Sequence, residues 1–159
     1  MPDIGLVTDV IVGFPGESEA AFLNTRALLE EIEFEVVHLA MYSARPGTFA
    51  ASRMEDDVPH DEKLRRLNDL LSLQRGIAAR KTARWIGRDV EVLIEGRDEL
   101  NRPYGRIRQG KRAVVLASPH AGKVARSAGW GSGDIAPGQL VTVRVLQATA
   151  GQLMGLPAA

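Results

Sequence analysis

Cysteine is absent from this chain of 159 residues. Its absence excludes disulfides, thiolate metal sites and any iron–sulfur cluster that the chain itself would ligate. The sequence also lacks an apolar run that approaches the roughly 20 residues of a membrane span. Its opening residues, Met-Pro-Asp, lack the basic segment of a secretory signal peptide. These absences predict a cytoplasmic protein that has no membrane partner.

The formal net charge is zero, but the charges are unevenly distributed along the chain. Acidic residues outnumber basic ones over residues 1–56, and basic residues outnumber acidic ones from residue 57 onward. A basic half is a weak indication of a polyanionic partner such as nucleic acid. A solvated charged surface is the commoner explanation of such an excess.

The first 56 residues predict one strand–helix–strand unit. Residues 6–13 form an apolar run with β-branched side chains, which is typical of a strand buried on both faces. The sequence Gly-Phe-Pro-Gly breaks this run, Ser18 is placed to cap a helix, and residues 34–42 read as a second strand. Two strands joined by a helix are expected to be parallel. The apolar face of the helix is predicted to comprise Phe22, Leu28, Leu29 and Ile32.

A long linking helix is predicted over residues 57–86. Pro59 suits its first turn, acidic residues follow, and basic residues lie near its far end, as the helix dipole favours. Gly87 is a plausible stop. Its apolar stripe is predicted to comprise Leu64, Leu67, Leu71 and Ala78, widened by Leu70, Leu73 and Ile77.

From residue 87 onward the apolar period changes to two, which predicts β-strands. Residues 90, 92 and 94 alternate with polar neighbours, and so do residues 141, 143 and 145. Gln109 and Gly110 are expected at the turn of a hairpin that returns over 113–116, and "GQLMGL" reads as a closing strand. A glycine-rich loop is expected at 118–138. Short antiparallel strands at this spacing predict a small closed barrel of the oligonucleotide-binding kind. The chain as a whole is therefore predicted to be an α+β protein in two parts.

Two loops are candidates for a ligand site. The stretches "GFPGE" and "YSARPGT" each follow a predicted strand, and ligands of α/β units bind beyond the carboxyl ends of strands. Tight turns between packed elements explain the same glycines and prolines. Neither stretch has the pattern of a phosphate loop or a dinucleotide loop. The three histidines lack metal-ligand spacing, and no serine stands in a nucleophile elbow. We therefore assign no catalytic residue and no metal ligand from the sequence.

The strongest local indication of a partner is the basic hairpin "NRPYGRIRQGKR". Clustered guanidinium groups can neutralise phosphates, and a tyrosine among them can stack on a base. A basic hairpin that protects a sheet edge from aggregation has the same composition. The candidate RNA-binding residues are Arg102, Tyr104, Arg106, Arg108, Lys111 and Arg112.

Four stretches in order carry a resemblance to a known family. They are "TDVIVGFPGESEAAF", "YSARPGTFA", "VPHDEKLRRLNDLLSLQ" and the run from "GRDVEVLIEG" through "GRIRQGKRAVV" to "GQLVTVRV". Together they resemble the C-terminal part of MiaB-type tRNA methylthiotransferases, which are radical S-adenosylmethionine (SAM) enzymes. The first two stretches at this spacing are the most specific part of the resemblance.

The resemblance implies a fold and a reaction. Residues 1–56 would be the last part of a radical-SAM partial (β/α) barrel, 57–86 the linking helix, and 87–156 a TRAM domain, which is a small RNA-binding β-barrel. The family places a methylthio group on an adenosine next to the tRNA anticodon, using SAM and two 4Fe-4S clusters. SAM and the clusters would supply the radical chemistry, while the protein orients the substrate. By resemblance, the residues on the SAM side are Val12, Gly13, Phe14, Ala40, Met41 and Tyr42.

The sequence also departs from the family. The cysteine motif CxxxCxxC and the three cysteines of the second cluster have no counterpart here, and Ala21 and Phe49 replace a common acidic residue and a common proline. We therefore expect a C-terminal portion that binds tRNA, around the anticodon stem-loop, but binds no cofactor and does not turn over alone. The alternatives are a stand-alone RNA-binding module, and one half of a split enzyme whose cysteine-bearing half is a separate chain.

Overall fold

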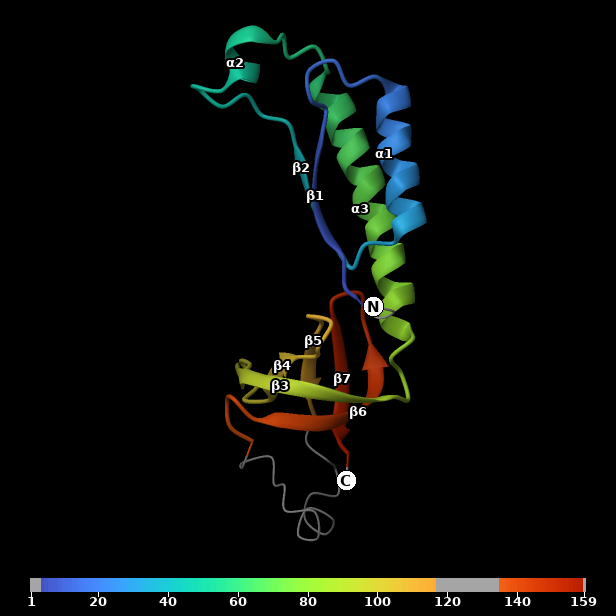
Figure 1. The fold of residues 1–159 in the computed structure, drawn as a ribbon, viewed down its shortest axis with the longest axis vertical. Helices are drawn as coiled ribbons and strands as arrows, with labels where there is room; N and C mark the ends of the chain where they lie inside the picture. Colours follow the sequence, from blue (N-terminus) through green and yellow to red (C-terminus); the bar gives the residue numbers. More distant parts are fainter. Residues whose placement is uncertain (1–3, 117–134, 159) are drawn as a thin grey trace. The chain divides into compact units, whose positions relative to one another are not determined.

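The computed structural model describes residues 4–116 and 135–158 (Figure 1). These residues fall into two compact units, one of residues 5–78 and one of residues 79–159 together with residues 1–4. The loop predicted at 118–138 lies outside the described residues as far as residue 134. In the described part of the chain, no helix combines the length and the apolar character that crossing a membrane requires.

The first unit contains the predicted strand–helix–strand arrangement. Its elements are β1 (Val7–Val12), α1 (Glu19–Ile32), β2 (Val36–Met41), the short α2 (Phe49–Arg53) and most of α3 (His60–Ala83). The two strands pair in parallel, from Val7 opposite Val36 to Val12 opposite Met41. Ser18 caps α1 as predicted, since its hydroxyl accepts from the Ala21 N–H at 3.2 Å.

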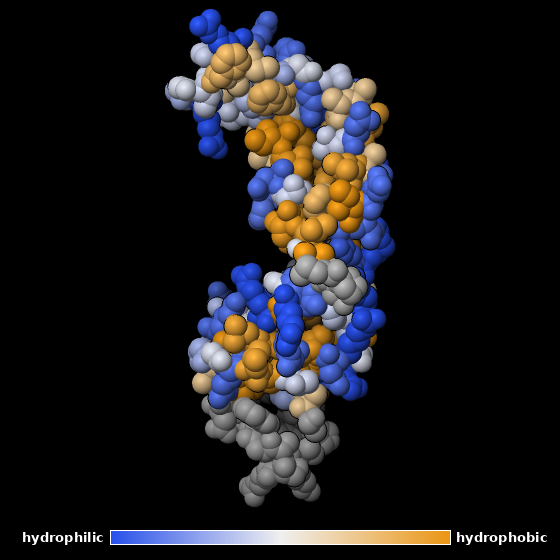
Figure 2. All heavy atoms as spheres, viewed as in Figure 1, coloured by the Kyte–Doolittle hydropathy of each residue, from blue (hydrophilic) through white to orange (hydrophobic). Residues whose placement is uncertain are grey.

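The prediction that β1 is buried on both faces is wrong. One face packs against the helices, and its core contains Val12, Val37 and the helical residues Phe22, Leu29 and Leu70. On the other face Val7 is 58% exposed and Ile11 is 56% exposed. Figure 2 shows apolar side chains reaching the surface of this unit. The sheet carries apolar side chains on both faces, with Asp9 and His38 in the middle of the outer one, and the described residues cover only the inner face.

The predicted apolar faces of the helices are also partly wrong. Leu28 and Ile32 of α1 are exposed, because α1 meets the rest of the unit along the narrower line of Phe22 and Leu29. In α3, Leu70 and Ile77 are fully buried, as predicted. Leu64 was also predicted to lie inward, but it is 42% exposed. Two cations occupy buried positions before Leu70 in the helix: Arg66 lies one turn before it and Lys63 two turns before it.

The second unit is a closed five-stranded barrel. Its strands are β3 (Asp89–Arg97), β4 (Pro103–Arg106), β5 (Arg112–Val115), β6 (Leu140–Ala148) and β7 (Gln152–Pro157), and they pair around the barrel in the order β3-β4-β5-β7-β6. The pair β5–β7 is parallel, so the prediction of an antiparallel barrel is wrong in this detail. Five is an odd number, and directions cannot alternate around a closed ring with an odd number of strands. One parallel pair is therefore unavoidable.

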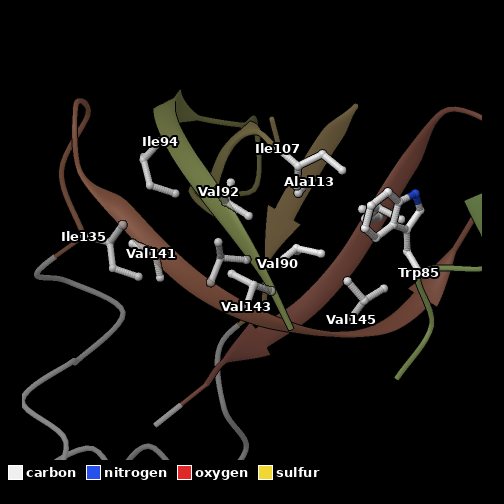
Figure 3. Packing of buried hydrophobic residues seen from close by; sticks show 12 residues of the cluster. Trp85, Val90, Val92, Ile94, Ile107, Ala113, Ile135, Val141, Val143 and Val145 are labelled. Carbon is white, nitrogen blue, oxygen red and sulfur yellow. The ribbon is translucent and has the colours of Figure 1, made fainter. Parts of the chain in front are cut away.

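The barrel core follows the predicted alternation. Figure 3 shows its inward side chains, which include residues 90, 92 and 94 of β3 and residues 141, 143 and 145 of β6. Trp85 lies at one end of this cluster and is only 8% exposed. The hairpin turn is also confirmed, because Gly110 has φ +76° and its N–H donates to the Ile107 carbonyl at 2.9 Å. The period-two pattern thus predicted the barrel interior correctly.

Two glycines allow neighbouring backbones to come close enough to close the barrel. A Cβ on Gly105 would collide with the Leu93 carbonyl, and one on Gly155 would collide with the Arg144 carbonyl. Each glycine lies opposite a bulge, in β3 after Ile94 and in β6 after Val145. Bulges sharpen the bend of a strand, and a glycine opposite one marks a close approach of backbones.

Gly155→Ala should therefore destabilise the barrel by about 1–3 kcal/mol or more, because backbone cannot move aside as a side chain does. Gly151→Ala is the matched control, since nothing lies within 4 Å of the Cβ it would add. Urea unfolding followed by Trp fluorescence measures both variants. Equal stability of the two variants would contradict the close-approach argument.

The two units should also differ in local stability. The sheet of the first unit has two strands and one uncovered face, whereas every strand of the barrel has two neighbours. We expect the amides of Val10 and Val12 to exchange hydrogen faster than the amide of Val143. Hydrogen exchange on the isolated chain is the measurement. Comparable protection of the three amides would count against this expectation.

Candidate functional site

The loop "GFPGE" after β1 is held by its own last residue. The Glu17 carboxylate accepts from the Gly13 N–H at 2.6 Å, and the Asp57 carboxylate accepts from the Gly16 N–H at 2.7 Å. Both glycines have positive φ, +69° and +81°, which favours glycine at each position. The loop is therefore fixed by two carboxylates rather than by backbone hydrogen bonds alone.

Arg66 of α3 joins this loop to the helix. Its guanidinium donates to the Glu17 carboxylate at 2.7 Å, to the Glu17 carbonyl at 2.8 Å and to Glu62 at 2.7 Å. The side chain of Arg66 is 5% exposed and that of Glu17 is 12% exposed. A buried charge of this kind is tolerated only when it is paired and hydrogen-bonded, and removing one partner is costly.

Lys63 is the second buried cation at the loop. Its ammonium group pairs with Asp56 and lies 5.1 Å from the centroid of the Tyr42 ring. Its aliphatic stem packs where a Cβ on Gly13 would lie, so any larger residue at Gly13 would displace it. Lys63 therefore connects the loop after β1 with the end of β2.

The carboxylate of Glu62 completes this network. It accepts from Arg65 at 2.6 Å and from Arg66 at 2.7 Å. The hydrogen bond from Arg65, supported by Arg66, lowers the pKa of Glu62 to about 2. Glu62 thus remains ionised over the whole neutral range and acts as a fixed anion between two arginines.

A hollow of about 360 Å³ lies beside this loop. Phe14 and Tyr42 meet edge to face in its wall, with ring centroids 5.1 Å apart. Of the residues predicted on the SAM side, four line the hollow, namely Phe14, Ala40, Met41 and Tyr42. Val12 instead belongs to the buried core, and Gly13 lies against Lys63. Arg45, Thr48 and Ala50 from the loop "YSARPGTFA" and from α2 also line it.

Sequence reasoning missed the residues that hold this loop, which are Glu17, Lys63 and Arg66. A signal for them existed in the spacing of α3. Lys63 and Arg66 precede Leu70 and Ile77 at intervals of three, four and seven residues, which places all four on one face. Cations on the same helix face as buried aliphatic residues indicate that their charges are paired inside the protein.

The basic hairpin of the barrel is exposed, but most of its arginines are paired with acids. Arg106 pairs with Glu95 at 3.1 Å, and Arg108 pairs with Glu91 at 2.8 Å. Both acids lie on β3. Arg102 pairs with Asp98 at 2.7 Å, and its hydrogen bonds hold the pKa of Asp98 below the usual range. The sequence therefore overstated the positive charge of this surface.

The remaining candidate RNA-binding residues differ from one another. Lys111 is 8% exposed, and its ammonium group donates to the Thr82 hydroxyl at 2.8 Å. It does not lie on the surface beside the exposed arginines. The Arg112 guanidinium lies 4.3 Å from the centroid of the Tyr104 ring. Tyr104 and Arg112 are thus brought together, as a cation–π pair.

Within residues 4–116 and 135–158, no group of three or more acidic or histidine side chains is arranged to hold a metal ion. The two described histidines, His38 and His60, lie on different elements, in β2 and at the start of α3.

Glu17→Gln tests the role of the buried pair. It removes the charge that Arg66 faces, and we expect the first unit to lose about 1–3 kcal/mol. Urea unfolding followed by the helical circular dichroism signal measures the loss. Glu19→Gln is the matched control. Glu19 is 51% exposed, pairs mainly with Arg65 at 2.6 Å and lies 3.5 Å from Arg66, so its loss should stay below about 0.5 kcal/mol. Equal losses in the two variants would refute the role given to Glu17.

The chain is similar over nearly its whole length to bacterial proteins named tRNA-2-methylthio-N(6)-dimethylallyladenosine synthase. It is 35% identical to the one from Bacteroides thetaiotaomicron, over 98% of this chain and 31% of the relative. It is 37% identical to the one from Akkermansia muciniphila over 98% and 31%, and 40% identical to the one from Chloroflexus aurantiacus over 99% and 31%. No family model matches the chain.

The chain thus spans about a third of the length of these relatives, and the matching part is their C-terminal portion. The matches cover both compact units, including the loop after β1 and the basic hairpin. By sequence, the chain corresponds to the C-terminal third of proteins named tRNA-2-methylthio-N(6)-dimethylallyladenosine synthase.

Proposed function

We propose that this chain supplies the tRNA-binding part, and one wall of the SAM site, of a MiaB-type tRNA methylthiotransferase. The reaction would be the 2-methylthiolation of an adenosine next to the tRNA anticodon. The observation that carries the proposal is the continuous similarity to these enzymes across 98% of the chain. The closed barrel of residues 89–157 supports it, because small barrels of this kind bind oligonucleotides.

The 4Fe-4S clusters of the family do not fit the residues of this chain. Such clusters are held by cysteine thiolates, and the chain has none. Cluster chemistry in the proposed reaction therefore requires ligands from outside these 159 residues. We expect an iron assay after anaerobic reconstitution to find no stoichiometric cluster on this chain.

The hollow beside the "GFPGE" loop fits part of a SAM molecule. Its wall combines the rings of Phe14 and Tyr42 with Ala40 and Met41 at the end of β2. An aromatic and apolar wall suits an adenine ring. When bound, SAM supplies the radical and methyl chemistry of the family. The residues of this chain would orient it and exclude water on one side.

A separate partner chain is the second candidate. The observation that favours it is the uncovered face of the first unit, where Val7, Ile11 and Val36 are 58%, 56% and 42% exposed. An apolar sheet face of this kind is expected to be covered in the assembled enzyme. In the split-enzyme alternative, the cysteine-bearing part would dock there. Co-purification of such a chain would support it, whereas a monodisperse chain that binds RNA alone would favour a stand-alone module.

Filter binding of the whole chain to tRNA tests the main proposal. We expect the affinity to fall as salt is raised, because phosphate contacts release counterions. Arg106→Ala with Arg108→Ala should weaken binding by roughly threefold to tenfold at low salt. Arg26→Ala with Arg53→Ala removes the same charge from the first unit and serves as the control. An affinity that does not respond to salt would refute the proposal.

A further inference from the structure

The barrel unit carries arginines in two chemical settings. Arg102, Arg106, Arg108 and Arg144 each form an ion pair with a carboxylate. Arg84, Arg88 and Arg112 instead lie over aromatic rings, and no carboxylate among the described residues pairs with any of them. Arg84 and Arg88 lie 5.3 Å and 5.9 Å from the Trp85 ring centroid, and Arg112 lies 4.3 Å from that of Tyr104.

The two settings have different consequences for a phosphate ligand. An arginine paired with a carboxylate holds that negative charge close to an incoming phosphate, and the repulsion offsets part of the attraction. An arginine that lies over a ring keeps its full positive charge, because the ring carries no net charge. The ring also restrains the guanidinium, so less freedom is lost when its N–H groups bind an anion. All three ring-associated arginines are exposed.

The three arginines also belong to one end of the barrel. Arg88 directly precedes β3, and the first residue of β3 pairs with Arg144 in the middle of β6. The last residue of β6 pairs near the start of β7, whose first residue pairs with Arg112 at the start of β5. The hydrogen bond from Lys111 to Thr82 ties this end to the last turn of α3. The start of β3 and the start of β5 are at the same barrel end, because both strands run antiparallel to β4.

We propose that Arg84, Arg88 and Arg112 form the main phosphate-binding surface of the barrel, at the end that Trp85 closes. The ligand is the phosphate backbone of RNA, and the inference rests on the proposed tRNA-binding function. The exposed arginines of the hairpin, Arg106 and Arg108, make the smaller contribution because each is already paired with an acid of β3. Arg112 alone belongs both to the predicted RNA-binding residues and to this surface.

The test compares variants of the whole chain in a salt titration with a labelled RNA stem-loop. Substituting all three arginines by glutamine should weaken binding on the order of a hundredfold at low salt and reduce the salt slope by about 2, since each single-stranded phosphate contact contributes about 0.7. Arg112→Gln alone should give a severalfold loss. Because the Arg112 side chain is exposed, this single variant is expected to fold, and it keeps the test valid if the triple variant does not. Arg144→Gln is the control, because Arg144 lies in the same barrel and donates to Asp89 at 2.7 Å.

The outcomes separate this inference from the function on which it rests. RNA binding by the parent chain that falls on the order of a hundredfold in the triple variant and severalfold in Arg112→Gln, but is kept in Arg144→Gln, supports the inference. Binding by the parent with an unchanged affinity and slope in the triple variant overturns it and leaves the proposed function standing. A larger loss from Arg106→Ala with Arg108→Ala than from the triple variant also overturns it. Failure of the parent to bind RNA overturns the proposed function itself.

Discussion

Closure is the constraint on which the barrel depends. Five strands can form a ring only if one neighbouring pair is parallel, and here the chain meets this condition at β5 and β7. Closure of so few strands also requires sharp bending, which the bulges in β3 and β6 provide. Gly105 and Gly155 lie opposite these bulges, where no side chain fits between the two backbones. A closed ring has one inner and one outer side. The alternate apolar residues therefore form the interior, which Trp85 covers at one end, and the arginines point outward.

The first unit depends on a different interaction. It has two strands and cannot close, so its loops are held by charges buried against α3. Arg66 and Glu17 are the centre of this arrangement, because the same carboxylate also accepts from the Gly13 N–H. Burying ions is expensive and contributes little net stability compared with apolar packing. The buried ion pair instead fixes the position of the loop. An ion pair with several hydrogen bonds specifies one loop conformation, whereas an apolar contact is compatible with several.

The sequence predicted what depends on periodicity and on local turn chemistry. The alternation of valines identified the inner face of β3 and β6, Ser18 identified the start of α1, and Gly110 identified the hairpin turn. It failed where the outcome depends on contacts between distant residues. Leu64 was expected inside because its spacing places it in one apolar stripe of the helix. Instead Lys63 and Arg66 hold buried positions, through acids from the loop after β1 and from the stretch before α3. Phe14 and Tyr42 were placed on the SAM side by family resemblance, and the spacing of residues alone could not have distinguished their loops from ordinary turns. The hollow that they line was not predicted.

The arginines show most clearly why composition is a poor guide to function. The sequence contains a cluster of basic residues around the hairpin, and counting them predicts one positive surface. In the fold, Arg66 is buried with an acid and orders a loop, whereas Arg106 and Arg108 are exposed with an acid beside each. Arg112 lies on a ring and keeps its charge. These settings differ in the free energy that it costs to bring the guanidinium group into contact with a phosphate. The partner of an arginine, which the fold decides, therefore determines whether the residue can serve RNA binding or only the architecture.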